Sequence, residues 1–114
     1  MEQVSPRPPI ILDENGDILM YASVEDACHN LEAIDVLDGA YMLFDSEGFR
    51  LDAEVSGHDV VGMSVVSDEP QRDDLAFRLR RFVVAVGPDR IGLPDAESAP
   101  LDRLIPALFA FFRN

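Results

Sequence analysis

Few residues in this chain could perform acid–base chemistry or bind a metal. The chain contains two histidines, His29 and His58, and a single cysteine, Cys28. Histidine is the usual general acid or base, and zinc sites are built largely from histidine and cysteine. Neither histidine stands three or four residues from the other or from Cys28, the spacing that places two ligands on one helix face. The sequence therefore predicts no catalytic residue, no metal site and no cofactor.

Carboxylates are far more numerous, and some are adjacent in the chain. The 22 acidic residues include the pairs Asp13-Glu14, Glu25-Asp26 and Asp73-Asp74. In so acidic a chain such pairs arise by chance, and most of these flank turns or helix starts, where they serve local capping. We expect none of them to be a hydrolytic dyad, and the chain is not predicted to be an enzyme.

The charge is distributed unevenly along the chain. Residues 1–70 hold 16 acids and two arginines, whereas residues 71–114 hold six acids and seven arginines, and the formal net charge is −13. Such a charge repels the phosphate backbone of nucleic acids and the anionic surface of membranes. Neither is therefore an expected partner.

Ten acids of the first half fall at predicted hairpin tips, on a predicted helix and on one strand face. They are Asp13, Glu14, Asp17, Glu25, Asp26, Glu32, Asp45, Glu47, Asp52 and Glu54. Together they could form one continuous negative surface. Such a surface could simply keep the protein soluble, or it could steer a cationic protein partner into place. Both interpretations stay open at this point, and the ten acids are the candidate partner-binding residues.

The elements that would position these acids can be read from local signals. Apolar runs flank Asn15-Gly16, a pair typical of a type I′ hairpin turn, and both strands are apolar on both faces, which predicts burial between layers. Ser23 is a helix cap, and Val24, Ala27, Cys28, Leu31 and Ile34 recur at helical spacing, so one helix is expected to end near Ile34 with these residues inward.

A second hairpin is predicted after this helix. Residues 40–44 form the third strand, and Gly48 provides the turn. The fourth strand, residues 49–55, alternates strictly, with Leu51 on the buried face and Arg50 on the wet face. Residues 60–66 are apolar throughout and are expected to form a central strand, in which Gly62 marks a bulge or a close approach.

The second half of the chain predicts helices. The first runs from Arg72 to Val86 and is stopped by Gly87-Pro88, and a loop follows over residues 89–99. The last helical segment, residues 100–113, is apolar all round and is expected to break at Pro106. Phe109 and Phe111 point about 200° apart on a helix, so both cannot point into the same core. The ring that does not is a candidate homodimer contact. Core packing alone is the alternative.

Several of these segments resemble small acidic bacterial proteins encoded beside polymorphic toxins, which are immunity proteins. The resemblance covers residues 9–55. It is carried by the segments Gly16-Asp17-Ile18-Leu19, Ser23-Val24-Glu25-Asp26-Ala27, Leu31-Glu32-Ala33-Ile34-Asp35-Val36, Gly39-Ala40-Tyr41 and Phe44-Asp45-Ser46-Glu47-Gly48. It implies a protein that inhibits a cognate toxin by binding it, and it assigns no inhibitory residue.

We expect one α+β domain over residues 9–114, preceded by a flexible lead, residues 1–8. Its sheet of about five mainly antiparallel strands, built from two hairpins and a further strand, is covered by two or three helices. The leading functional hypothesis is a non-enzymatic immunity protein that neutralises a cationic toxin. The alternatives are a small-molecule-binding or enzymatic domain that uses a crevice between sheet and helix, and a structural homo-oligomer. The single cysteine and the lack of a visible signal peptide predict a cytoplasmic location.

Overall fold

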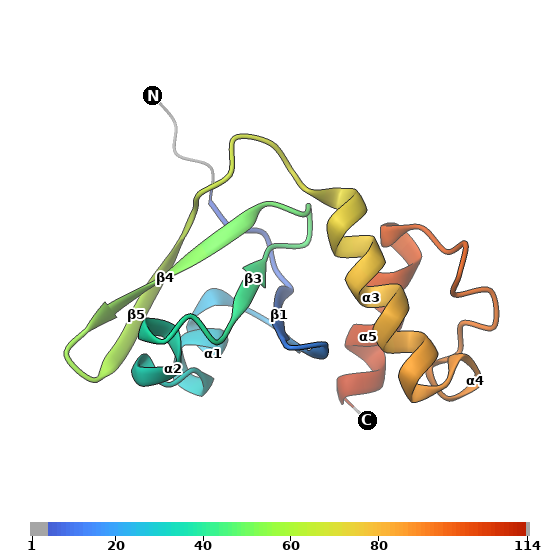
Figure 1. The fold of residues 1–114 in the computed structure, drawn as a ribbon, viewed down its shortest axis with the longest axis horizontal. Helices are drawn as coiled ribbons and strands as arrows, with labels where there is room; N and C mark the ends of the chain where they lie inside the picture. The colour runs from blue at the N-terminus through green and yellow to red at the C-terminus, as the bar shows by residue number, and fades with distance from the viewer. Residues whose placement is uncertain (1–4, 114) are drawn as a thin grey trace.

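The computed structural model describes residues 5–113, and Figure 1 shows the chain as a sheet with helices on both sides. The strands are β1 (Ile10–Glu14), β2 (Asp17–Tyr21), β3 (Met42–Phe44), β4 (Arg50–Ser56) and β5 (Asp59–Val65). The helices are α1 (Val24–Asn30), α2 (Ala33–Leu37), α3 (Arg72–Val86), α4 (Pro88–Ile91) and α5 (Leu101–Arg113). The predicted α+β class and the five-stranded antiparallel sheet are confirmed.

The strands are ordered β2-β1-β3-β4-β5, and every neighbouring pair is antiparallel. The prediction that the fifth strand is central was wrong. The α1–α2 connection carries the chain back to pair β3 with β1, so β5 pairs only with β4 and forms an edge. Its apolar run is divided accordingly, because Val60 and Met63 are buried whereas Val61 is 59% exposed. Gly62 does mark a bulge, since Glu54 pairs with Gly62 and Val55 with Val60.

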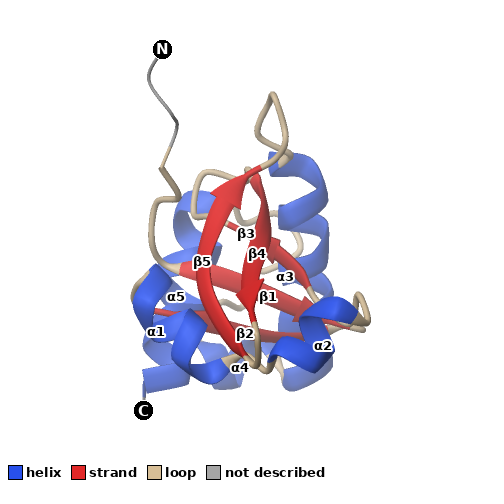
Figure 2. Cartoon of the chain, turned by 90° about the vertical axis from the view of Figure 1, so that its left-hand side faces the viewer, coloured by secondary structure: helices blue, strands red, loops and turns tan. Residues whose placement is uncertain are grey.

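The sheet separates two apolar cores. On one side α1 and α2 pack over Ile10, Leu12, Leu43 and Leu51, which we call the α1/α2 core. On the other side α3, α4 and α5 pack over Ile11, Ile18, Met20 and Phe44, which we call the α3/α5 core. Figure 2, seen from the end that carries α1, α2 and the β4–β5 turn, shows α1 and α2 toward the viewer and α3, α4 and α5 behind the strands. None of the helices in residues 5–113 is long and apolar enough to cross a bilayer.

The first hairpin forms as its turn chemistry predicts. Asn15 and Gly16 have φ angles of 54° and 97°, which an Asn-Gly pair tolerates. Strand β1 is buried on both faces, as expected for a strand between two layers. Strand β2 is not, because it lies at the other edge of the sheet and leaves Leu19 47% exposed.

The helix predicted to end near Ile34 is in fact two helices. Ser23 caps α1, and its hydroxyl accepts the Asp26 N–H at 3.0 Å. Leu31 and Glu32 then adopt extended backbone, with ψ angles of 142° and 133°. These two residues reset the helical phase, so Leu31 is still buried whereas Ile34, predicted to point inward, is 64% exposed.

The helices of the second half agree with the prediction from the sequence, except in two places. Helix α3 spans Arg72–Val86 as predicted, and α4 occupies part of the predicted loop. Helix α5 continues through Pro106 without the expected break. Pro106 and Asp102 are both exposed, so the Asp102 carbonyl that loses its helical partner faces solvent, where water can satisfy it.

The predicted flexible lead is also partly held in place. Residues 1–4 lie outside the described part of the chain. Arg7, however, donates its N–H to the Asp45 carboxylate at 3.2 Å and accepts the Ser46 N–H at 2.9 Å. The lead therefore docks on the turn between β3 and β4 before β1 begins.

Candidate functional site

Two of the ten candidate acids lie inside the protein and cannot meet a partner. Asp13 is 6% exposed and Asp45 is fully buried. The Asp45 carboxylate accepts the N–H groups of Glu47 at 2.9 Å and Phe49 at 3.0 Å, as well as that of Arg7. It therefore organises the β3–β4 turn, which is why a carboxylate is buried there.

Asp13 joins the sheet to α3 through an ion pair with Arg78. The Arg78 guanidinium donates to Asp13 at 2.6 Å and to Asp74 at 3.1 Å, and Asp13 also accepts the Gly16 N–H at 2.8 Å. Desolvation lowers the pKa of the Arg78 guanidinium, but the hydrogen bonds to the two carboxylates outweigh it and raise that pKa. This pair holds the Arg78 side chain against the sheet, where it is 25% exposed.

A third candidate, Glu47, is half-buried and already paired. It lies 3.6 Å from Arg7 and 3.7 Å from Arg72. The remaining seven candidates are exposed, and no cationic side chain in residues 5–113 lies within 4 Å of any of them. They are Glu14, Asp17, Glu25, Asp26, Glu32, Asp52 and Glu54.

These seven acids are not confined to one face of the sheet. Leu51, Ala53 and Val55 face the α1/α2 core, so Asp52 and Glu54 project from the opposite face of the sheet. Glu25, Asp26 and Glu32 lie on the α1/α2 side. Five of the seven acids thus lie on two faces of the end that carries α1, α2, β4 and β5, which we call the acidic end, whereas Glu14 and Asp17 flank the β1–β2 turn beside α3. Three acids outside the candidate set, Asp35, Asp38 and Asp59, belong to this end as well.

Burial is the main cause of raised pKa values for three weak acids at this end, and nearby carboxylates are the second. Burial and then the charges of Asp26 and Glu14 raise the pKa of Tyr21. Burial and then the charge of Glu54 raise the pKa of the Cys28 thiol, which disfavours the reactive thiolate. Burial and a 2.9 Å hydrogen bond to Asp35 raise the pKa of Tyr41 to about 12.

Helix α2 adds an apolar feature to the acidic end. Ile34 and Leu37 are 64% and 72% exposed and lie three residues apart, on one face of the helix. Sequence reasoning missed this pair because it assigned Ile34 to the inward stripe of one long helix. No preferred N-cap residue marks the start of α2, since Glu32 at that position forms no side-chain capping hydrogen bond, so no local signal predicted a second helix.

The structure also brings both histidines and the cysteine together. Cys28, His29, His58 and Asp59 line a hollow of about 370 Å³ where α1 packs on β5. Within residues 5–113, however, no three potential ligands are arranged to hold a metal ion.

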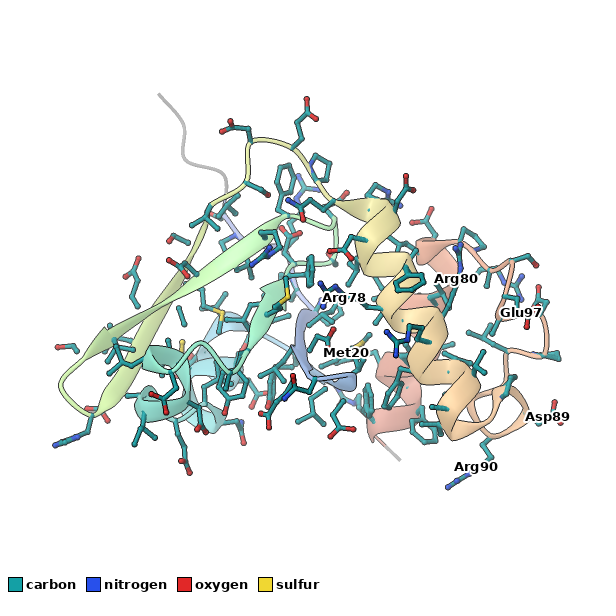
Figure 3. The ribbon with its side chains drawn as sticks, in the orientation of Figure 1. Met20, Arg78, Arg80, Asp89, Arg90 and Glu97 are labelled. Carbon is teal, nitrogen blue, oxygen red and sulfur yellow. The ribbon has the colours of Figure 1, made fainter. Side chains whose placement is uncertain are left out.

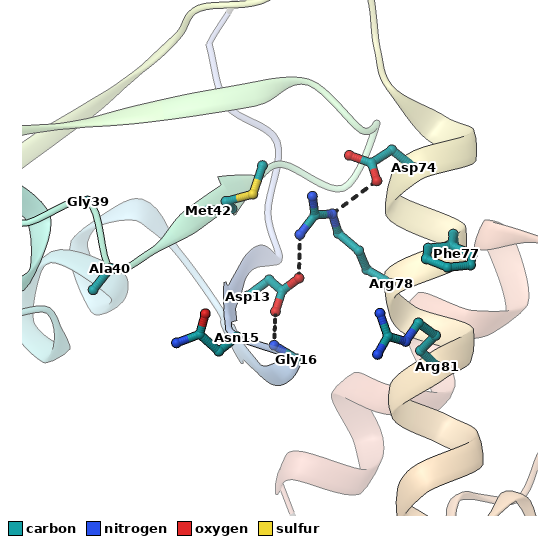
Figure 4. Close-up of a pocket in the computed structure, with 10 residues that line it drawn as sticks. All are labelled: Asp13, Asn15, Gly16, Gly39, Ala40, Met42, Asp74, Phe77, Arg78 and Arg81. Atoms are coloured by element: carbon teal, nitrogen blue, oxygen red, sulfur yellow. Dashed lines mark hydrogen bonds and ion pairs between the residues drawn. The ribbon is translucent and has the colours of Figure 1, made fainter.

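A second hollow, of about 420 Å³, lies between the sheet and α3 (Figure 4). Three segments distant in sequence line it: the β1–β2 turn, the α2–β3 connection and the middle of α3. Asp13, Asp74 and Arg78 form its ion-paired wall, and Arg81 points from α3 toward the turn at Gly16. The Arg81 guanidinium lies over the Phe77 ring, 5.7 Å from its centroid. This hollow is a sheet–helix crevice of the kind that the small-molecule alternative requires.

Comparison of the chain with protein-family models, curated proteins and solved structures finds no match.

The candidate oligomer contact on α5 is used largely within the chain. Phe109 and Phe111 both pack partly buried against the α3/α5 core. The Phe111 ring contacts Phe112 edge-on at 5.7 Å, and Arg113 lies over the Phe109 ring at 5.3 Å. Because α5 contacts both α3 and β2, two of its sides are covered. Both rings nevertheless stay partly exposed, so a homodimer contact through them remains a prediction.

Proposed function

We propose that this protein is a non-enzymatic binding module whose acidic end captures a cationic protein, and that the partner is a toxin which it neutralises. The observation that carries the proposal is the uncompensated charge of the exposed acids on α1, α2, β4 and β5. None of them forms an ion pair within the described residues, although the same chain pairs Asp74, Asp95 and Asp102 with arginines elsewhere.

Uncompensated charge of one sign opposes folding, because the acids repel one another in the compact state. A surface needed only for solubility can mix both signs, as the α3–α5 part of this chain does. A single-sign surface instead raises the rate at which an oppositely charged partner associates and fixes its orientation. The acidic end therefore fits a steering role better than a purely protective one.

The resemblance of residues 9–55 to immunity proteins supports a toxin as the partner. An acidic inhibitor would mask a basic active surface, such as the one with which a nuclease holds its substrate. Such an inhibitor acts in the cytoplasm of the cell that produces the toxin.

The test begins with a neighbouring reading frame that encodes a toxin-like domain. The two proteins are expressed together and separately, and cell survival and the association rate of the purified pair are measured. We expect survival only when this protein is present. We also expect the association rate to fall as salt rises, because the screening length is only about 8–10 Å at 0.1–0.15 M salt. Equal killing with and without this protein would refute the immunity role.

Matched charge reversals locate the binding end. Glu32→Lys/Asp38→Lys changes two exposed, unpaired acids beside α2, whereas Asp89→Lys/Glu97→Lys makes the same change of net charge in the helical part. Figure 3 shows Asp89 and Glu97 projecting outward far from α2. We expect the first variant to slow association roughly tenfold and the second to change it much less. Equal effects would show that net charge alone acts and that the acidic end is not the binding site.

A second candidate function rests on the crevice of Figure 4. Its volume suits a small ligand, and Arg81 has no carboxylate partner within 4 Å among residues 5–113. The function would be binding of a small anion against Arg81 and Phe77. Titration with small carboxylates and phosphates, followed by NMR, tests it: shifts at Arg81 that disappear in Arg81→Met would support it, and no shifts would dismiss it.

A further inference from the structure

Ile34 and Leu37 are the most exposed large apolar side chains in the described part of the chain. Exposed in this way, they contribute almost nothing to the stability of the core and lower solubility. They lie on one face of α2, and together with the acids Glu32, Asp35 and Asp38 we call them the α2 anchor surface.

The helix that carries this surface is fixed in place although it has only five residues. Its first residue, Ala33, is buried. The Asp38 N–H donates to the Ile34 carbonyl at 3.0 Å, and the Tyr41 hydroxyl donates to the Asp35 carboxylate at 2.9 Å. A partner would therefore not have to order this helix, and contacts made there would be retained as binding free energy.

The charge around the two apolar side chains selects the kind of partner. Glu32 and Asp38 flank the helix at its two ends, and no arginine occurs between residues 8 and 49. A second copy of this chain would bring the same acids against one another, and an anionic membrane would be repelled likewise. A cationic protein surface is attracted instead.

We infer that the α2 anchor surface binds an apolar side chain of the partner that is flanked by arginine or lysine residues. This inference rests on the proposed function and names the contact at its centre. Buried apolar residues surrounded by a charged rim are the usual source of affinity in protein interfaces. The acids then act on the association rate, and Ile34 and Leu37 act on the dissociation rate.

Two arginine-rich peptides of equal length and charge serve as probes, one with a central Leu-Phe and the other with a central Ser-Gly. Their binding to the isotope-labelled protein is measured by NMR at low salt. We expect the Leu-Phe peptide to bind about tenfold more tightly, because burying an apolar side chain contributes that much, and to shift the methyl signals of Ile34 and Leu37. The variant Ile34→Ser/Leu37→Ser should bind both peptides equally.

The matched control is Phe77→Ser/Val84→Ser, which removes two exposed apolar side chains of α3, 57% and 53% exposed. It should leave the preference for Leu-Phe unchanged, and the amide spectra of both variants should show an intact fold. Equal binding of the two peptides, or shifts centred on Phe77, would overturn the inference and leave the charge-based function standing. If neither peptide binds even at low salt, the proposed function itself fails.

Discussion

Residues 10–66, the sheet half of the molecule, hold thirteen acids and one arginine, whereas residues 72–113, the helical half, hold six acids and seven arginines. Five of the six ion pairs in the described residues use an arginine of the helical half, and the sixth uses Arg7. The sheet half offers one cation in return, Arg50, and its guanidinium lies over the Phe44 ring, 5.6 Å from the centroid. The two halves therefore differ less in acid content than in how far the acids are neutralised.

The two halves also use their arginines and apolar side chains differently. In the helical half, Arg80 donates to the Ala99 carbonyl at 2.8 and 3.1 Å, which fixes the segment before α5, and Arg78 ties α3 to the sheet (Figure 3). The sheet half exposes Ile34 and Leu37 on α2 beside unpaired acids. The helical half thus uses its arginines for contacts within the chain, whereas the sheet half leaves acids and apolar side chains without such contacts, as the proposed binding role requires.

The largest expected effect tests whether the halves share one folding unit. Leu51 is 3% exposed in the α1/α2 core, and Leu104 is fully buried in the α3/α5 core. Leu51→Asp and Leu104→Asp should each cost more than about 4 kcal/mol and unfold the whole chain, because β1 contributes to both cores. Denaturant unfolding followed by circular dichroism measures this.

The control for this prediction is Asp52→Lys, on the wet face next to Leu51, which should change stability by less than about 0.5 kcal/mol. Arg50 is a poorer control than its position in the strand indicates, because its side chain packs on Phe44 and its Nε is buried without a hydrogen-bond partner in the described structure. Unfolding of only one half in Leu51→Asp would show two independent units.

A smaller effect is expected where the halves are joined. Arg78→Met leaves Asp13 buried without its cation and should cost about 2–4 kcal/mol, reduced from the fully buried case because Arg78 is 25% exposed. Adding Asp13→Asn should recover much of this loss, since the amide oxygen can still accept the Gly16 N–H. Thermal melts of the single and double variants measure the coupling. Arg81→Met, one turn further along α3, should have little effect, and equal losses from Arg78→Met and Arg81→Met would show that the junction is not held by this pair.

The smallest effect concerns the repulsion within the sheet half. Glu32→Lys/Asp38→Lys should stabilise the fold by about 0.5–1 kcal/mol at low ionic strength, and the gain should shrink as salt is added. The two positions lie at opposite ends of α2, so their helix-dipole effects offset each other. Asp89→Lys/Glu97→Lys should not stabilise, because the helical half is nearly neutral. If both variants, or neither, were more stable than the unmodified protein, the acids of the sheet half would not be less neutralised than those of the helical half.

The local structure of this protein is determined by short stretches of its sequence. Asn15-Gly16 accepts positive φ angles, Ser23 caps the first helix, and Gly87-Pro88 ends a helix whose bounds, Arg72–Val86, follow from apolar periodicity. Each signal acts through atoms a few residues apart, so the sequence alone predicts it, and the α+β class follows from their order.

The identity of the functional surface depends on contacts between distant residues, which only the tertiary structure decided. Asp13 is held inside the protein by its ion pair with Arg78, 65 residues away. Asp45 is held inside by hydrogen bonds from its own turn and from Arg7, 38 residues away. The extended backbone at Leu31-Glu32 starts a second helix in a new orientation, so Ile34 points outward. The pairing of β3 with β1 leaves β5 at the edge of the sheet. Whether a carboxylate is buried or free depends on which cation the fold brings beside it, and no local pattern encodes that neighbour.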